Sequence, residues 1–430
     1  MTREIGTATR SVLWCVTLAV CLHAALRVPM SADLLALWLA GQSLAAGAPH
    51  LVYPAETMFT MRPPGEWAAM AAAAGHGQHV YPYLYPPLTA ALVAPLTETL
   101  RFATFARAAL WINVALGLAT SWLAWRATGR VLALPLFLLF GALVFHGTIF
   151  GAVALEQGQP QILVAFLCVL AIERLGARAP VVAGAALALA AAIKVYPALF
   201  VVFLVARREG RATAAFAVTG AGLAALSLAL AGWPLHAAFL RQLHAISQTA
   251  VVLPLTFSLD TLAGTWHGAE ILARQVTVPG YEAHSATIGV VGKGALWTTL
   301  DRLALLGVLG GFAVAFARRP HRVLLWPAAM IALAMVSPLA WAHHFLAAVA
   351  FAPALLVRWH PATLLAVFAP LSLPVLTTPG LGPLVLSHLS VLGAAAMTAL
   401  WLMMLLRPPR PRHGTAAGAD HKAGRTVSAG

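Results

Sequence analysis

Apolar segments long enough to cross a lipid bilayer recur through nearly the whole chain, and they constrain its fold more than any other sequence feature. A helix needs about 20 apolar residues to cross the hydrocarbon core, where backbone polar groups must bond to one another. Hydrophobic residues make up 61% of the sequence and charged residues only 9%, whereas a soluble domain has roughly 25% charged residues. These features predict an all-α polytopic membrane protein.

The apolar segments predict a single transmembrane domain over residues 1–406, a bundle of about 10 to 13 membrane-spanning helices. Several segments are short, and polar residues interrupt two neighbouring pairs, so the divisions can be drawn in more than one way. The candidate spans are 11–28, 101–125, 131–150, 161–176, 180–193, 196–206, 212–232, 298–317, 322–341, 343–357, 361–379 and 384–406.

The basic residues fix the expected orientation. The net charge of +14 would suggest a nucleic-acid partner in a soluble protein, but here the basic clusters fall on one side of the candidate spans. Cytoplasmic loops carry such an excess of Lys and Arg. We therefore expect a multi-pass cell-membrane protein with both termini in the cytoplasm, the lipid bilayer as its partner, and no nucleic acid. The clusters are Arg3/Arg10, Arg126/Arg130, Arg174/Arg178, Arg207/Arg208/Arg211, Arg318/Arg319/Arg322, Arg358 and Arg407/Arg410/Arg412.

Two long loops then lie on the extracytoplasmic face, at residues 29–100 and 233–297. In the first loop, residues 33–46 are apolar and helix-prone, which predicts an amphipathic helix along the membrane surface. The short apolar run 88–96 follows a proline-rich stretch and is interpreted as a re-entrant or interfacial piece. The tail 407–430 is rich in Pro, Arg, Gly and Ala, and we expect it to be a disordered cytoplasmic segment.

Asp33 is the first acidic residue after the first apolar segment, at the point where the chain has just left the membrane. Its structural interpretation is an N-cap of the following helix, with Ser31 nearby. Its functional interpretation is a general base, because a carboxylate at the mouth of a cleft can accept a proton from an acceptor hydroxyl. The residue alone leaves both interpretations open.

Two polar interruptions on the same face have the same double interpretation. Gln159 and Gln161 belong to a run of amides between two spans; it is either an ordinary polar turn or a site that bonds sugar hydroxyls, since amides both donate and accept. Lys194 interrupts a long apolar run just before Tyr-Pro, on the side where positive charge is disfavoured. Its ammonium either snorkels to the interface or holds a phosphate as a point charge.

The sharpest local feature is the run Ser-Pro-Leu-Ala-Trp-Ala-His-His at 337–344. Its proline breaks a helix and delivers Trp341, His343 and His344 to the outer face. An aromatic belt at the membrane interface explains Trp341 but not the histidine pair. Adjacent histidines on a helix point about 100° apart and rarely share one ion, so we expect bonds to a phosphate or sugar rather than a metal.

Taken in order, these pieces resemble glycosyltransferase family 87, the polyprenol-phosphate-mannose-dependent mannosyltransferases of GT-C architecture. The resemblance covers residues 31–350, and the ordered set is more specific than any one motif. It is carried by Asp33 with its helix, Gly47 and Tyr53; by Tyr-Pro-Pro-Leu at 85–88 with Pro-Leu at 95–96; by Gly-Gln-Pro-Gln at 158–161; by the segment 184–197 around Lys194; and by Ser-Pro-x-x-Trp-x-His-His at 337–344.

The resemblance implies transfer of a hexose, with mannose as the usual sugar of the family, from a polyprenyl-phosphate donor to a lipid or glycan acceptor, on the extracytoplasmic face and with inversion. It implies no metal and no other cofactor, since fixed cations can stabilise the phosphate leaving group. Asp33 would be the catalytic base, and Lys194, His343 and His344 would bind the donor phosphate. The implied sugar or acceptor contacts are Tyr85, Gln159, Gln161, Trp341 and Ser258.

The chain departs from the family pattern at three positions. Gln161 stands where the family has Asn, Ala340 replaces a Ser, and Phe257 interrupts a segment of which Ser258 and Leu259 remain. The sequence has no Walker A run, dinucleotide-binding glycine motif, HExxH or DxD motif. The alternative function is a transporter or lipid flippase, which would place polar residues and paired half-helices along a path through the bilayer midplane.

Overall fold

The computed structural model describes residues 6–27, 31–54, 65–73, 75, 80–266, 270–277 and 285–406, and these residues are overwhelmingly helical. Four helices are long and apolar enough to cross a membrane, and the bent pair of α18 (Leu381–Ser387) and α19 (Leu389–Leu405) adds a fifth if it is one span. The predicted class, an all-α polytopic membrane protein, is confirmed, while the larger span count stays a prediction. The four long helices are α1 (Thr7–Leu26), α5 (Phe102–Ala127), α11 (Gly210–Ser247) and α13 (Ala295–Arg318).

Shorter helices fill the rest of the described chain. The α-helices are α2 (Ala32–Ala45), α3 (Gly65–Ala73), α4 (Pro87–Thr99), α6 (Leu134–Gly147), α7 (Ile149–Glu156), α8 (Gln161–Gly176), α9 (Pro180–Ile193), α10 (Val201–Ala206), α12 (Leu259–Trp266), α14 (Leu325–Met335), α15 (Leu346–Val349), α16 (Pro361–Phe368) and α17 (Leu373–Leu376). The 3-10 helices are η1 (Pro49–Leu51), η2 (Tyr196–Phe200), η3 (Ala342–Phe345), η4 (Ala352–Val357) and η5 (Ala369–Leu371).

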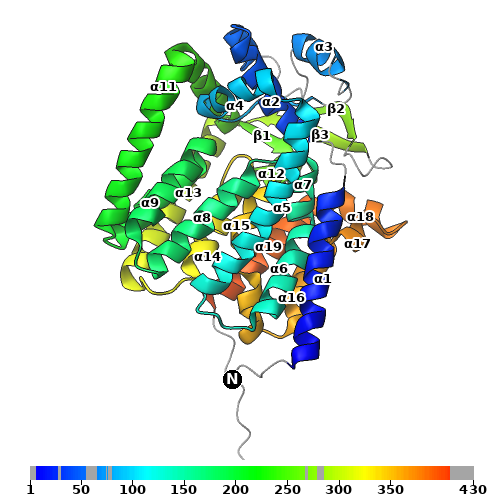
Figure 1. Cartoon of the computed structure of the whole chain (residues 1–430), viewed down its shortest axis with the longest axis vertical. Coiled ribbons are helices and arrows are strands. Elements are labelled where there is room, and N and C mark those ends of the chain that lie inside the picture. Colours follow the sequence, from blue (N-terminus) through cyan, green and yellow to red (C-terminus); the bar gives the residue numbers. More distant parts are fainter. Residues whose placement is uncertain are drawn as a thin grey trace, which may run out of the picture.

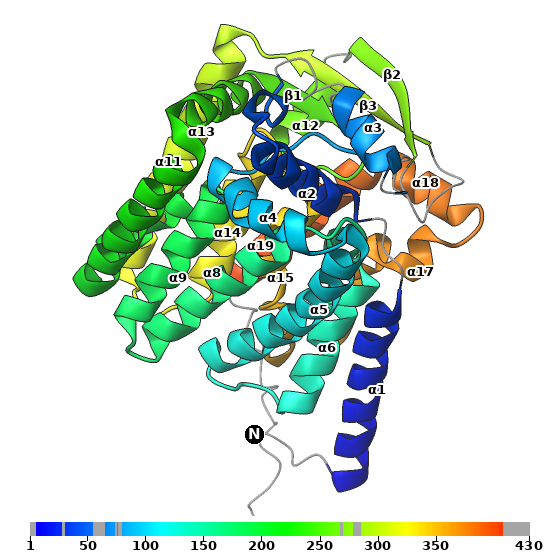
Figure 2. The same cartoon turned by 45° about the horizontal axis from the view of Figure 1, so that its top comes forward.

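One small sheet, which the sequence did not predict, lies in the second long loop. It has three antiparallel strands in the order β1-β3-β2, with Thr249 opposite Gly292 and Ser285 opposite Thr277. This sheet gathers with α2, α3 and α4 at one end of the molecule, at the top of Figures 1 and 2, and the long helices extend away from it. The strands are β1 (Thr249–Val252), β2 (Glu270–Thr277) and β3 (Ser285–Gly292).

Prolines and glycines break several helices near this end. Helix α9 ends at Ile193, Lys194 is extended with φ −138° and ψ 133°, and η2 restarts with Pro197 in its first turn. Proline suits a helix start because its missing N–H would be unpaired there anyway. Helix α11 is kinked at Gly232, whose φ of 72° is a left-handed value, and it continues to Ser247. Residues 233–247, predicted as part of a loop, are therefore helical.

The first long loop folds into its own apolar cap. Helices α2 and α4 pack so closely that a Cβ on Gly41 would lie 3.1 Å from the backbone nitrogen of Ala94. Trp38 packs against the ring of Phe105 with centroids 5.1 Å apart, and Trp67 donates its indole N–H to Ser43 Oγ at 2.9 Å. The predicted run 88–96 lies within α4, whereas the position of these helices relative to the bilayer surface stays a prediction. The predicted tail 407–430 lies outside the described residues.

Candidate active site

A cavity of about 890 Å³ lies where the α2–α4 cap meets the broken ends of the bundle. Its volume falls within the range of small-molecule sites in proteins. It is lined by residues from far-apart parts of the chain, including α2, the segment 81–86, the α7–α8 turn, the α9–η2 break and the 337–344 turn. Of the residues predicted from sequence, it is lined by Asp33, Tyr85, Gln159, Lys194, Trp341, His343 and His344.

Asp33 stands in the first turn of α2 and is not the helix N-cap. Ser31 holds that position, with a left-handed φ of 54° and no side-chain cap bond. The N–H of Ser31 donates to the carbonyl of Glu156 at 2.8 Å, and the N–H of Leu34 donates to that of Gln157 at 3.1 Å. The start of α2 is therefore docked on the α7–α8 turn, which leaves the Asp33 carboxylate at the cavity wall.

The Asp33 carboxyl is shifted toward its neutral form. Burial raises its pKa from 3.8 to about 6, and the hydrogen bond from Gln159 and the positive charge of Lys194 partly offset that rise. Asp33 lies in the first long loop, outside the candidate spans. A carboxylate with a pKa near neutrality is ionised at pH 7 and basic enough to accept a proton.

The α7–α8 turn orients this carboxylate through Gln159. Its side-chain Nε2 donates to Asp33 Oδ2, and its Oε1 accepts from the Tyr85 hydroxyl at 2.6 Å. The backbone carbonyl of Tyr85 accepts in turn from the Tyr53 hydroxyl at 2.5 Å. Gly158 makes this turn possible, because its φ is +63° and a Cβ there would lie 2.8 Å from Leu34 Cβ. The nitrogen and the oxygen of the Gln159 side-chain amide are thus both fixed by partners.

Lys194 and His344 meet on the other side of the cavity. Lys194 Nζ lies 3.1 Å from His344 Nε2 and 5.4 Å from the centre of the Tyr85 ring. An ammonium can only donate, so Nε2 of His344 accepts and the imidazole is neutral when Lys194 is charged. No salt bridge joins Asp33 or Lys194 to an opposite charge within the part of the chain that the structure describes.

His343 is buried beside them with unused hydrogen-bonding capacity. It is 3% exposed, and neither ring nitrogen has a partner among the described residues. Its ring is parallel to that of Trp341, at 6.2 Å between centroids and 6° between planes, and lies edge-on to that of His344. Buried polar groups are normally paired, so an imidazole left in this way beside a cavity is suited to bind a ligand.

The turn that carries these histidines is held by a short antiparallel bridge. The N–H of Phe257 donates to the carbonyl of Ala340 at 2.8 Å, and the N–H of Ala342 donates to that of Leu255 at the same distance. Leu255 also lines the cavity. The segment 253–258 therefore forms one wall of the cavity and fixes the backbone of the histidine turn.

Two of the predicted sugar contacts do not line the cavity. Gln161 is fully buried at the start of α8 and donates from Nε2 to the Tyr196 hydroxyl at 2.8 Å. Ser258 is fully buried against Thr261, with 3.0 Å between their hydroxyl oxygens. Both side chains are turned into the protein by polar partners, so the structure does not bring them to the other predicted residues.

Other residues of the cavity were not singled out from the sequence. Tyr81, Tyr196, Arg27 and Glu156 line it. The first two belong to tyrosine- and proline-containing runs already recognised as helix breaks, which was the available signal. Arg27 and Glu156 also line a second, mostly apolar cavity of about 480 Å³ between α1, α6 and α7. Within the described residues, no three side chains of His, Cys, Asp or Glu gather as metal ligands.

The fold and this cavity define a polytopic helical membrane protein with a polar, cation-containing site at one end of its bundle. The family model of glycosyltransferase family 87 matches residues 83–340, more than half of the chain, and the chain belongs to this family. The resemblance inferred from the motifs is confirmed, and the protein is a membrane glycosyltransferase. Comparison with curated proteins gives no match.

Proposed function

We propose that this glycosyltransferase moves a hexose, with mannose as the first candidate, from a polyprenyl-phosphate donor to a lipid or glycan acceptor, with inversion. The observation that carries the proposal is that a carboxylate with a raised pKa and a lysine–histidine pair face one cavity without neutralising each other. A sugar phosphate needs both groups: a base for the acceptor and fixed positive charge for the leaving phosphate.

In the proposed reaction, Asp33 accepts the proton of an acceptor hydroxyl as that oxygen bonds to the anomeric carbon. The bond from this carbon to the phosphate oxygen breaks on the opposite side, and its electron pair stays with the phosphate. Lys194 stabilises the charge that develops there, and His343 offers a hydrogen bond from its unpartnered ring. His344 holds the Lys194 ammonium in place by accepting a hydrogen bond from it. One displacement of this kind inverts the anomeric configuration.

Two further residues support the reaction by orientation. Gln159 holds the Asp33 carboxylate, and Tyr85 holds Gln159 through its hydroxyl while its ring faces Lys194. Trp341 presents an aromatic surface beside the histidines, a shape suited to the face of a sugar ring. The second, apolar cavity shares five lining residues with the first, among them Arg27, and offers room for the hydrocarbon chain of a lipid substrate.

The basic clusters support an extracytoplasmic position for this site and a cytoplasmic position for both termini. Reactivity of introduced cysteines with an impermeant reagent in intact cells tests this orientation. Membership of a glycosyltransferase family favours the enzyme over a transporter or flippase.

The direct test is transfer by the purified protein in lipid vesicles. We expect radiolabel from polyprenyl-phosphate-mannose to appear in an acceptor glycolipid or glycan with wild-type protein and to be lost with Asp33→Asn. Parallel donors with glucose or a nucleotide-linked mannose separate the sugar from the carrier. Transfer from the nucleotide donor alone would overturn the proposed donor class, and full activity of folded Asp33→Asn would overturn the base.

A further inference from the structure

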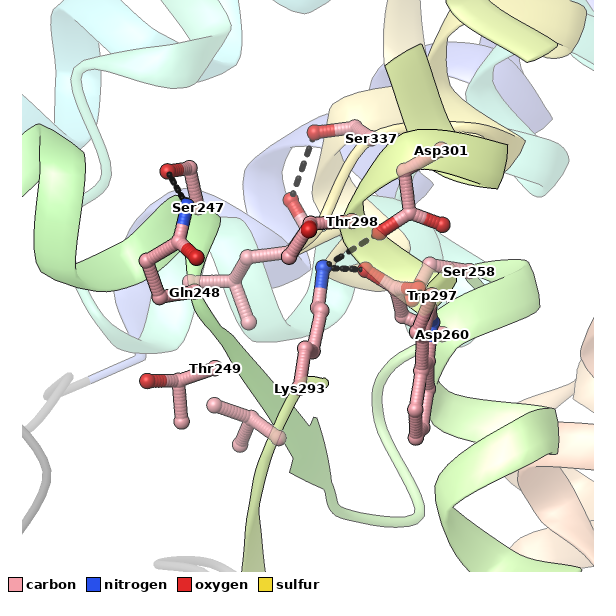
Figure 3. Close-up of polar contacts among 12 residues, drawn as sticks. Ser247, Gln248, Thr249, Ser258, Asp260, Lys293, Trp297, Thr298, Asp301 and Ser337 are labelled. Atoms are coloured by element: carbon pink, nitrogen blue, oxygen red, sulfur yellow. Dashed lines mark hydrogen bonds and ion pairs between the residues drawn. The ribbon is translucent and has the colours of Figure 1, made fainter. Parts of the chain in front are cut away.

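A second group of charges lies at the same end of the molecule, and none of its residues lines the cavity. Figure 3 shows its contacts. The Lys293 side chain is 1% exposed, and its Nζ contacts the carboxylate of Asp260 and, at 2.9 Å, that of Asp301. Asp260 is 4% exposed and also accepts from the indole N–H of Trp297 at 2.7 Å. Removing ions from water is costly, so a buried ammonium matched by two carboxylates holds its elements in a defined arrangement.

This charge group joins two elements of the second long loop to α13, one of the four long apolar helices. Lys293 follows β3 directly, Asp260 is in the first turn of α12, and Trp297 and Asp301 are on α13. The backbone N–H of Lys293 also donates to the carbonyl of Gln248, just before β1. We call Lys293, Asp260 and Asp301 the loop clamp. It fixes the start of α12 against the sheet and α13.

The start of α12 is the end of the cavity wall. Residues 253–258, which form the wall, precede it. The hydroxyl of Thr261, in the first turn of α12, bonds this wall: it lies 2.9 Å from Thr256 Oγ1 and 3.0 Å from Ser258 Oγ. The same hydroxyl bonds the carbonyl of Val251 in β1 at 3.0 Å. Ser258 therefore acts within this connection, which accounts for its burial away from the cavity.

The wall in turn sets the position of the phosphate-binding turn. Its residues Leu253 and Leu255 face the cavity, and its two backbone hydrogen bonds to Ala340 and Ala342 flank Trp341. His343 and His344 follow at once along the chain. A continuous chain of bonds thus leads from the loop clamp, through α12 and the wall, to the histidines beside Lys194.

We infer that Lys293 is a positioning residue for the donor phosphate, acting through the wall and the 337–344 turn. The inference rests on the proposed function, in which His343 binds that phosphate and His344 holds Lys194 toward it. Displacement of the turn would weaken binding of the phosphate but leave the Asp33 side of the cavity, held by Gln159, in place. A clamp with only a structural role would instead lower stability without changing one substrate's binding selectively.

The charge group around Glu173, at the C-terminal end of α8, provides a matched control for the loop clamp. Glu173 is 3% exposed and pairs with Arg126 at 2.9 Å and with Arg174 at 2.5 Å, where α8 ends. It also joins separate elements through a buried charge with two partners, but none of its three residues lines the cavity.

The test compares Lys293→Met combined with Asp260→Asn, which removes the two buried charges and leaves only the partly exposed Asp301 carboxylate, with Glu173→Gln. Equilibrium binding of radiolabelled polyprenyl phosphate, transfer kinetics and Tm are measured on each purified protein in lipid. We expect the Kd for polyprenyl phosphate and the donor KM to rise about tenfold in the double variant, with the acceptor KM unchanged. Glu173→Gln should lower Tm and leave both constants as in wild type.

Lys293→Arg guards against a variant that fails to fold, since it keeps the charge with altered geometry and should fall between wild type and the double variant in Kd. An unchanged Kd in folded double variant overturns the inference, as does an equal change in the acceptor KM. Because the binding assay needs no turnover, these outcomes differ from failure of the proposed function, which is seen as absent transfer by wild type.

Discussion

The charges near the two ends of helix α8 have different kinds of partner. At its C-terminal end, Glu173 is neutralised by two arginines. Near its N-terminal end, the cavity holds Asp33 against an amide and Lys194 against an imidazole, with no salt bridge to either in the described part of the chain. Both arrangements give each charge a hydrogen-bonding partner, but only the second leaves its charge available to a substrate.

The difference distinguishes stabilising charges from reactive ones. A buried ion pair is strongly destabilised by removal of one partner, because the other charge is then unmatched. Replacement of Asp33 by asparagine should cost the protein less stability, since Gln159 can still donate a hydrogen bond to the asparagine carbonyl oxygen. Substitutions at the Glu173 end should therefore change stability, and those at the cavity should change the reaction.

The largest effect is expected for Asp33→Asn, because the amide cannot accept the acceptor's proton. We expect kcat to fall by about 10²- to 10⁴-fold, the usual contribution of a general base. Transfer of radiolabelled sugar measures the rate, and Tm in detergent measures folding. The Tm should be unchanged or higher, and a marked loss of Tm would place Asp33 with Glu173 among the structural charges.

Lys194→Met should have the next largest effect, because it removes the cation that stabilises the leaving phosphate. The expected loss of kcat/KM is about 10²- to 10³-fold, comparable to removal of one transition-state donor. Lys194→Arg serves as the control, since it keeps the charge and should retain part of the rate. Equal activity of the methionine and arginine variants would exclude a role for this charge.

The pH dependence follows from the raised pKa of Asp33. Activity should fall as pH drops through about 6, about tenfold per unit well below it, because the carboxylate becomes protonated. The pKa of Asp33 in the folded protein exceeds its usual value of 3.8, so protonation of Asp33 stabilises the fold. This stabilisation is complete below pH 3.8 and is lost as the pH rises through about 6. Rates and Tm measured from pH 5 to 8 test both signs. An activity profile that is flat across pH 6 in wild type would contradict the base assignment.

Glu173→Gln tests the other side of the comparison. The neutral amide loses the charge that Arg126 and Arg174 share, and we expect the free energy of unfolding to fall by about 1 to 3 kcal/mol. The turnover per folded molecule should stay as in wild type. Denaturation in mixed micelles gives the free energy of unfolding, and rates normalised to active sites give the turnover. A loss of kcat without a loss of stability would contradict the assignment of Glu173 as a stabilising charge.

Tyr85→Phe should have the smallest effect. It removes the hydroxyl that donates to Gln159 Oε1 but leaves the aromatic ring that faces Lys194. We expect kcat/KM to fall by about 3- to 10-fold, the equivalent of one hydrogen bond. Tyr83→Phe is a matched control on the same segment, because the Tyr83 hydroxyl bonds the carbonyl of Pro86 and does not reach Gln159. Similar losses in both variants would indicate a change in the segment as a whole.

Much of the fold was accessible from the sequence because lipid imposes simple rules. Apolar length and scarce charge predicted a helical membrane protein, and prolines marked the helix breaks at Lys194 and Ser337. The sheet of the second loop was missed, since its strands lie in a polar, glycine-containing region without clear alternation. The extension of α11 beyond Gly232 was missed because a glycine followed by Pro234 usually ends a helix, whereas here it only kinks one.

The sequence by itself determined the class, the family motifs and the residue types that face the cavity. Only the tertiary structure decided which of them meet: Gln159 bonds a carboxylate 126 positions away, while Gln161, two residues further, turns inward to Tyr196. The physical reason is that motif chemistry is local, but contact depends on packing. The docking of α2 on the α7–α8 turn, and of the 253–258 wall on the histidine turn, sets those distances.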